Sequence, residues 1–163
     1  MNKGYETRND LAPALRKEIA GMLNARLAEA IDLALQAKQA HWNVKGPQFI
    51  ALHELFDKVH DAARGWSDLM AERAVQLGGI AEGTVQRVAE RSALPPYPLK
   101  AIDGRQHVDA LSGAMGAFAK SVRAAIDQAA QSGDAGTADL FTEVSRGADQ
   151  MLWFLEAHLQ AER

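Results

Sequence analysis

The chain has 163 residues, of which 47% are hydrophobic, and it carries a formal net charge of −3. A chain of this length supports one hydrophobic core and not two, and we expect a short tail over residues 1–12 followed by a single domain over residues 13–163. The absence of cysteine excludes disulfides, thiolate metal sites and cysteine nucleophiles, and is compatible with a reducing cytoplasm. The first ten residues lack the apolar core of a signal peptide and no later run is long enough to span a membrane, so we expect a cytoplasmic protein without a membrane partner.

The first half of the domain predicts two long helices. Over residues 15–41 an apolar side chain recurs at every fourth position until Gly46 and Pro47 interrupt the pattern. A second helix is expected to begin near Pro47, because proline is favoured in the first turn, and to stop at Gly78 and Gly79.

A long connection separates these helices from two more. Residues 80–104 contain three prolines and two glycines, with a short helix expected over residues 86–91. Apolar residues at helical spacing then predict a third helix over residues 108–126 and, after the SGDAGT loop, a fourth over residues 141–159. Two helical hairpins joined by a long crossover between the second and third helices predict an all-α, ferritin-like four-helix bundle.

Five candidate metal ligands lie in or beside the second helix: His41, His53, Asp57, Asp68 and Glu72. His53 and Asp57 are four residues apart, as are Asp68 and Glu72, so each pair stacks on one helical face. Asp57 and Asp68 are about 16 Å apart on a continuous helix, too far for one ion. An antiparallel two-fold copy of the helix would bring the two pairs together, which predicts a homodimer with two symmetric shared sites.

An ordinary alternative is a packed histidine beside a solvated stripe of carboxylates. The many apolar residues between the candidate ligands argue instead for a buried surface, where unpaired charges are costly. Imidazole and carboxylate ligands without thiolate favour iron, manganese or zinc, in that order. Because hard carboxylates stabilise ferric iron, we identify the set as a ferroxidase candidate.

Two runs in this region closely resemble the Dps miniferritins, the DNA-binding proteins from starved cells. They are KQAHWNVKGPQFIALHELFD at residues 38–57 and SDLMAERAVQLGG at residues 67–79. Residues 137–156 are similar to the last helix of that family and residues 7–10 to its N-terminal start. The resemblance implies a hollow homododecamer built from two-fold dimers. In it one subunit gives His41, His53 and Asp57, and its mate gives Asp68 and Glu72.

The resemblance also implies an activity. A Dps protein is an iron-sequestering ferroxidase: it oxidises Fe(II), preferably with hydrogen peroxide, stores ferric iron in the shell and so protects DNA from oxidative damage. We expect room for two iron ions per site, with Asp57 as a bridge and Glu72 binding in two modes. One alternative is a non-enzymatic DNA-binding or DNA-compacting protein whose metal sites mainly stabilise the dimer. Another is a small di-iron oxygenase, although nothing in the chain indicates an organic substrate pocket.

Several further residues are interpreted as accessory. Trp42 and Trp66 flank the ligands and are expected to pack at an interface, or to give up an electron that traps stray oxidising equivalents. His60 follows Asp57 at a D-x-x-H spacing, but the family pattern requires no ligand there, so we expect a solvated or supporting histidine.

Three other polar residues receive structural interpretations. His107 and His158 lie outside the ligand pattern and are expected at the surface. Arg73, next to Glu72, is expected in a structural ion pair.

DNA binding has weaker support than iron oxidation. Dps proteins that condense DNA use a longer lysine-rich tail, whereas here Lys3 and Arg8, the candidate DNA contacts, are balanced by Glu6 and Asp10. A dodecamer would carry a formal charge of about −36, twelve times −3, although twelve weak tails could still add avidity. We expect nucleoid association only if the tails bind DNA.

Overall fold

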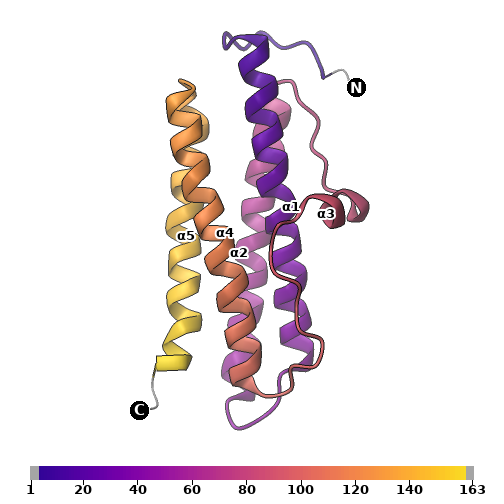
Figure 1. Cartoon of the computed structure of the whole chain (residues 1–163), viewed down its shortest axis with the longest axis vertical. Coiled ribbons are helices and arrows are strands. Elements are labelled where there is room, and N and C mark those ends of the chain that lie inside the picture. Colours follow the sequence, from indigo (N-terminus) through magenta and orange to yellow (C-terminus); the bar gives the residue numbers. More distant parts are fainter. Residues whose placement is uncertain (1–3, 161–163) are drawn as a thin grey trace.

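In the computed structural model the described residues are 4–160, and they form five helices and no strand. The helices are α1 (Pro13–Asn43), α2 (Phe49–Gln76), α3 (Val85–Arg91), α4 (Gly104–Gln131) and α5 (Ala135–Gln160). Figure 1 shows α1 and α2 as one antiparallel hairpin and α4 and α5 as the other, side by side. The crossover containing α3 runs along the bundle from the end of α2 to the start of α4 (Figure 1). The all-α bundle with its long crossover is thus confirmed.

Most helix boundaries lie within two residues of the expected ones, but α4 and α5 begin earlier than their apolar patterns and α4 ends later. Asp103 caps α4: its carboxylate accepts a 2.9 Å hydrogen bond from the backbone N–H of Gln106, while the Gln106 side chain accepts from the backbone N–H of Asp103. This reciprocal cap satisfies two amides that a helix start otherwise leaves unpaired. Such polar first turns precede the apolar residues, so periodicity alone places the start too late.

The core fills the seams between the two hairpins. It is built around large side chains that are essentially inaccessible to solvent, namely Phe56, Met70, Met115, Phe118 and Phe141. Many other positions of the core are alanine, which lets the helices approach closely. Among the described residues none of the helices is both long enough and apolar enough to cross a membrane.

The end of α2 and the start of the chain are packed together. The backbone N–H of Tyr5 donates a 2.8 Å hydrogen bond to the carbonyl of Gly78. Gly78 has a φ of +81°, and a Cβ on it would lie only 2.7 Å from the Tyr5 carbonyl oxygen. Glycine is therefore required both to end the helix and to let the N-terminal segment lie against it.

The crossover covers one end of α4, and this corrects one expectation. His107 was predicted at the surface, but its exposed fraction is only 1%. Tyr97, in the crossover, lies over it and forms a short hydrogen bond to its Nδ1, and Phe56 packs nearby. The sequence pattern of α4 could not reveal this, because the cover comes from a segment without helical periodicity. His158, in the last turn of α5, is half-buried.

Candidate metal centre

The turn between α1 and α2 brings two of the predicted ligands into contact. Gly46 adopts a φ of +114° and its carbonyl accepts from the Phe49 N–H, so the chain reverses within a few residues. The last turn of α1 then faces the first turns of α2. As a result the rings of His41 and His53 stack with their centroids 3.6 Å apart.

Each of these rings is held by the backbone of the other helix. His41 Nδ1 lies 2.8 Å from the carbonyl oxygen of His53, and His53 Nδ1 lies 2.9 Å from the carbonyl oxygen of His41. A carbonyl oxygen can only accept, so both Nδ1 atoms carry the proton and donate. In the neutral rings both Nε2 atoms therefore keep a lone pair, which is the state that metal ligation needs.

Asp57 completes this group one helical turn further along α2. Its Oδ1 lies 3.4 Å from His41 Nδ1, and the ammonium group of Lys38, on α1, contacts the same carboxylate oxygen. The hydrogen bond from Lys38 is the main reason that the pKa of Asp57 lies below its ordinary value, against the opposing effect of desolvation. The carboxylate is therefore ionised at neutral pH and available to a cation.

Lys38 is the residue that sequence reasoning missed. It lies three positions before His41, so both point from one face of α1 toward the start of α2. That spacing was a usable signal. A lysine is not expected among cation ligands, so this spacing did not single it out.

Asp68 and Glu72 are not brought to this group within one chain. Both are exposed on α2, about four to five turns beyond His53. Within residues 4–160 no three histidine, aspartate or glutamate side chains are close enough to hold a metal ion. One chain thus presents an incomplete ligand set, and the sharing of a site between two chains stays a prediction.

The two tryptophans have different environments. Trp42 is 68% exposed next to His41. Trp66 is buried within its own chain, where its ring stacks on Phe118 at a centroid distance of 5.7 Å. A Cβ on Gly147 would come within 2.9 Å of the Trp66 ring, so α5 needs glycine there. Trp66 thus packs in the core, and of the two only Trp42 is free to pack on another molecule.

The remaining candidates make other contacts. His60 is half-buried and its Nδ1 lies 3.0 Å from the carbonyl of Ala34, so it links α2 to α1. Arg8 is exposed, and Lys3 lies outside the described residues. The predicted ion pair of Arg73 is confirmed: its guanidinium donates to Asp134 at 2.9 Å and joins the end of α2 to the start of α5.

Comparison with known proteins bears on the family and on the fold. A family model described as a ferritin-like domain matches residues 20–163. The "DNA protection during starvation protein" of Agrobacterium fabrum is similar at 48% identity, with 97% of this chain and 98% of that protein covered. Two solved structures have the same fold. Dps from Microbacterium arborescens "in the high iron form" has a TM-score of 0.85 at 34% identity, covering 91% of this chain and 96% of that one. Mycobacterium smegmatis Dps has a TM-score of 0.91 at 28% identity, covering 99% and 96%.

One assignment accounts for the bundle of two hairpins, for the histidine pair beside an ionised carboxylate, and for the 48% sequence identity to the Agrobacterium protein over almost the full length. The chain belongs to the Dps family of ferritin-like proteins.

Proposed function

We propose that this protein is a ferroxidase that takes up Fe(II), oxidises it preferably with hydrogen peroxide, and stores the ferric product. The observation that carries the proposal is the reciprocal hold on His41 and His53, which leaves both Nε2 atoms free beside the ionised Asp57. The donors are two neutral nitrogens and one anionic oxygen. Such a mixed set suits Fe(II) and grows more favourable as the ion becomes ferric.

The site is completed by a second chain in this proposal. Asp68 and Glu72 of a two-fold mate would supply two more carboxylates, enough for two ions with Asp57 between them. Support comes from the apolar side chains that a single chain exposes on α1 and the start of α2, including Trp42, Phe49 and Ile50. Exposed apolar surface of this kind is typical of an interface.

Iron is the substrate of the reaction, and the electron balance is simple. Two Fe(II) ions give one electron each to a peroxide molecule, which takes up two protons and leaves as two water molecules, with two Fe(III) ions produced. The residues of the chain orient the iron ions and balance part of their positive charge. The histidines hold their lone pairs in place, and Lys38 occupies the Asp57 carboxylate until a cation replaces it.

Membership of the Dps family supports proposals about the assembly of the chain, the storage of iron and the protection of DNA. The Agrobacterium relative is named for DNA protection and the Microbacterium structure is described as a high iron form. We propose that this chain forms a dodecameric shell in the cytoplasm that holds ferric iron and spares DNA by consuming iron and peroxide together. The backbone N–H of Tyr5 donates to the Gly78 carbonyl and ties the N-terminal segment to the end of α2, which gives less support to DNA contact by Arg8 on a free tail.

Peroxide-driven oxidation tests the proposal directly. Fe(II) oxidation by sub-stoichiometric peroxide would be followed by absorbance on the wild type, on His53→Ala/Asp57→Ala and on a matched control, His158→Ala/Asp127→Ala, whose residues lie on α5 and α4. We expect rapid oxidation by the wild type and control, and a loss of at least about tenfold in the site variant. Equal rates in all three would reject the site. No oxidation in any of them would favour the alternative of a DNA-compacting protein with structural metal sites.

A further inference from the structure

A half-open cavity lies at the opposite end of α1 from the histidine pair. It has a volume of about 370 Å³ and is lined by the N-terminal segment, the first turns of α1, the glycines after α2 and the last residue of α3. Figure 1 shows the N-terminal segment, the top of α1 and the chain leaving α2 meeting at this end. Its volume lies at the low end of the range of about 300–1,000 Å³ for ligand pockets, so it suits a small ligand.

Most of the charged side chains that line this cavity are cationic. Arg16, Lys17 and Arg91 line it, and the single carboxylate among the lining residues is Glu82. Glu82 pairs with Arg91 at 2.7 Å. Three cations against one carboxylate leave a local excess of two positive charges in a chain whose net charge is negative.

Two of these cations have no ion-pair partner among the described residues. Among residues 4–160 neither Arg16 nor Lys17 has a carboxylate within ion-pair distance. The Nε atom of Arg16 is also buried and lacks a hydrogen-bond acceptor within that part of the chain. Leaving a buried guanidinium donor unpaired is costly, and a bound anion would remove that cost.

The walls of the cavity are fixed in position. Asn24, buried on α1, donates to the Ile80 carbonyl at 2.9 Å and accepts from the Glu82 N–H at 2.8 Å, which pins the chain after α2. Gly79 approaches α1 so closely that a Cβ on it would lie 2.8 Å from the Cβ of Ala20. The pocket is therefore preorganised and does not need a ligand to assemble it.

We propose that this cavity is a phosphate-binding site, in which Arg16 and Lys17 are the principal contacts and Arg91 a supporting one. A dianionic phosphate matches the local excess of two positive charges, and a guanidinium offers two parallel donors to phosphate oxygens. The phosphate could belong to a free anion or to the phosphodiester backbone of DNA. The site is separate from the ferroxidase ligands and does not depend on the proposed activity.

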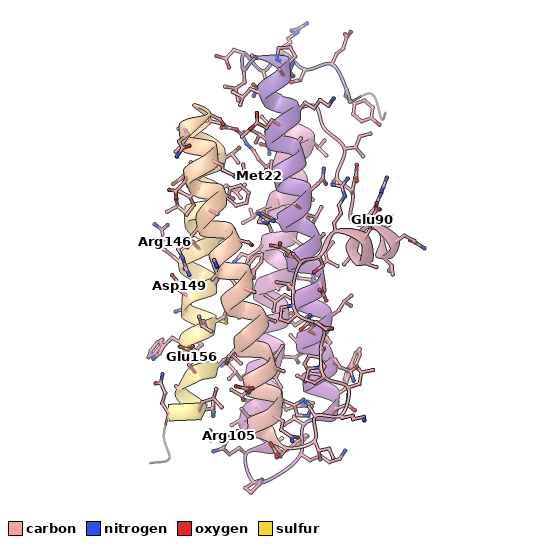
Figure 2. The ribbon with its side chains drawn as sticks, in the orientation of Figure 1. Met22, Glu90, Arg105, Arg146, Asp149 and Glu156 are labelled. Atoms are coloured by element: carbon pink, nitrogen blue, oxygen red, sulfur yellow. The ribbon has the colours of Figure 1, made fainter. Side chains whose placement is uncertain are left out.

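Calorimetric titration of the metal-free protein with inorganic phosphate at low ionic strength tests this site. We expect saturable binding with one site per chain, weakened at least about tenfold in Arg16→Gln/Lys17→Gln. The control, Lys120→Gln/Arg146→Gln, removes the same charge from exposed positions and should change affinity by less than about twofold. Figure 2 shows Arg146 on the outer side of α5, away from the N-terminal end of α1. No saturable binding by the wild type, or equal losses in both variants, would overturn the proposal.

A second variant separates loss of the site from loss of the fold. Gly21 lines the cavity and a Cβ on it meets no atom within 4 Å, so Gly21→Leu should fold normally while filling the space and weakening phosphate binding. Unchanged affinity in that variant would also contradict the proposal.

Duplex DNA then distinguishes the two sources of phosphate. If the backbone of DNA occupies the site, anisotropy of a labelled duplex should show weaker binding in Arg16→Gln/Lys17→Gln than in the control, and inorganic phosphate should compete. If the free anion alone occupies the site, the affinity for the duplex should be the same in the variant as in the control. Either result, together with saturable phosphate binding, supports the site and assigns its source.

Discussion

Lys38 and Asp57 form the closest charge contact of the candidate metal centre, and Lys38→Gln should change its pH dependence. The Lys38 hydrogen bond lowers the pKa of Asp57, so the carboxylate remains ionised as the pH falls. Without it the pKa of Asp57 rises, and protons compete with Fe(II) at a higher pH. The acid midpoint of Fe(II) oxidation should therefore move upward.

The matched control for this prediction is Lys58→Gln, which removes an exposed lysine next to Asp57 in the chain. A pH profile of the oxidation rate on both variants provides the measurement. An acid midpoint equal to that of the wild type in Lys38→Gln would show that the contact does not tune the carboxylate.

At the level of single residues, the sequence predicted which residues form the candidate metal centre better than it predicted the contacts that those residues make. The spacing of His53 and Asp57 placed them on one face, and the structure has them there with His41. The sequence could not predict that each histidine ring would donate to the backbone carbonyl of the other histidine, because that contact depends on the angle between α1 and α2. Lys38 was missed for a different reason, because a lysine is not expected among cation ligands. Trp66 was expected at an interface, but it packs on Phe118.

Among the elements, the crossover is held to α1 and α4 by individual side-chain hydrogen bonds, and the one from Tyr97 reaches the buried His107. Burial raises the pKa of Tyr97 to about 12 and lowers the pKa of His107, so a protonated phenol faces a neutral imidazole. The Tyr97 hydroxyl can then donate to His107 Nδ1. This bond connects the proline-rich segment to the first turns of α4.

Tyr97→Phe should therefore destabilise the chain. The change removes the donor and leaves a buried acceptor on His107 unpaired, which costs about 1–3 kcal/mol. Urea unfolding followed by circular dichroism measures the loss. Tyr5→Phe, at a residue 71% exposed, is the control and should be nearly neutral. A Tyr97→Phe midpoint equal to that of the control would mean that the bond contributes nothing.

The existence of the helices was predictable from periodicity, but the starts of α4 and α5 were not. The strong stops at Gly46 and Gly78 place the ends of α1 and α2 well, because glycine there takes a positive φ. The starts of α4 and α5 depend on Asp103 and Asp134, whose carboxylates accept from backbone amides before any apolar pattern appears. Capping contacts of this kind can be read from the sequence only once the helix start is known.

For the whole molecule, the feature to test is the exposed apolar surface on the end of α1 and the start of α2, which includes Trp42, Phe49 and Ile50. Ile50 lies one turn before His53 and is 61% exposed in a single chain. If two chains share the metal centre, this side chain becomes buried between them. The ferroxidase activity and the dimer should then be lost together.

Ile50→Glu tests that coupling. A carboxylate placed in an apolar interface without a partner is unfavourable, so we expect smaller particles by light scattering and a loss of Fe(II) oxidation of at least about tenfold, with helicity unchanged. Leu99→Glu is the control, because Leu99 is 79% exposed on the crossover. Normal activity in a variant that has become monomeric would contradict a shared centre.

The hold on the two histidines has an evolutionary consequence. Each ring is oriented by a main-chain carbonyl, and every residue type supplies the same carbonyl. Substitution of the surrounding side chains therefore leaves the orienting acceptors in place as long as the hairpin keeps its geometry. Related proteins can therefore differ in many of the side chains around His41 and His53 and still orient the two rings in the same way.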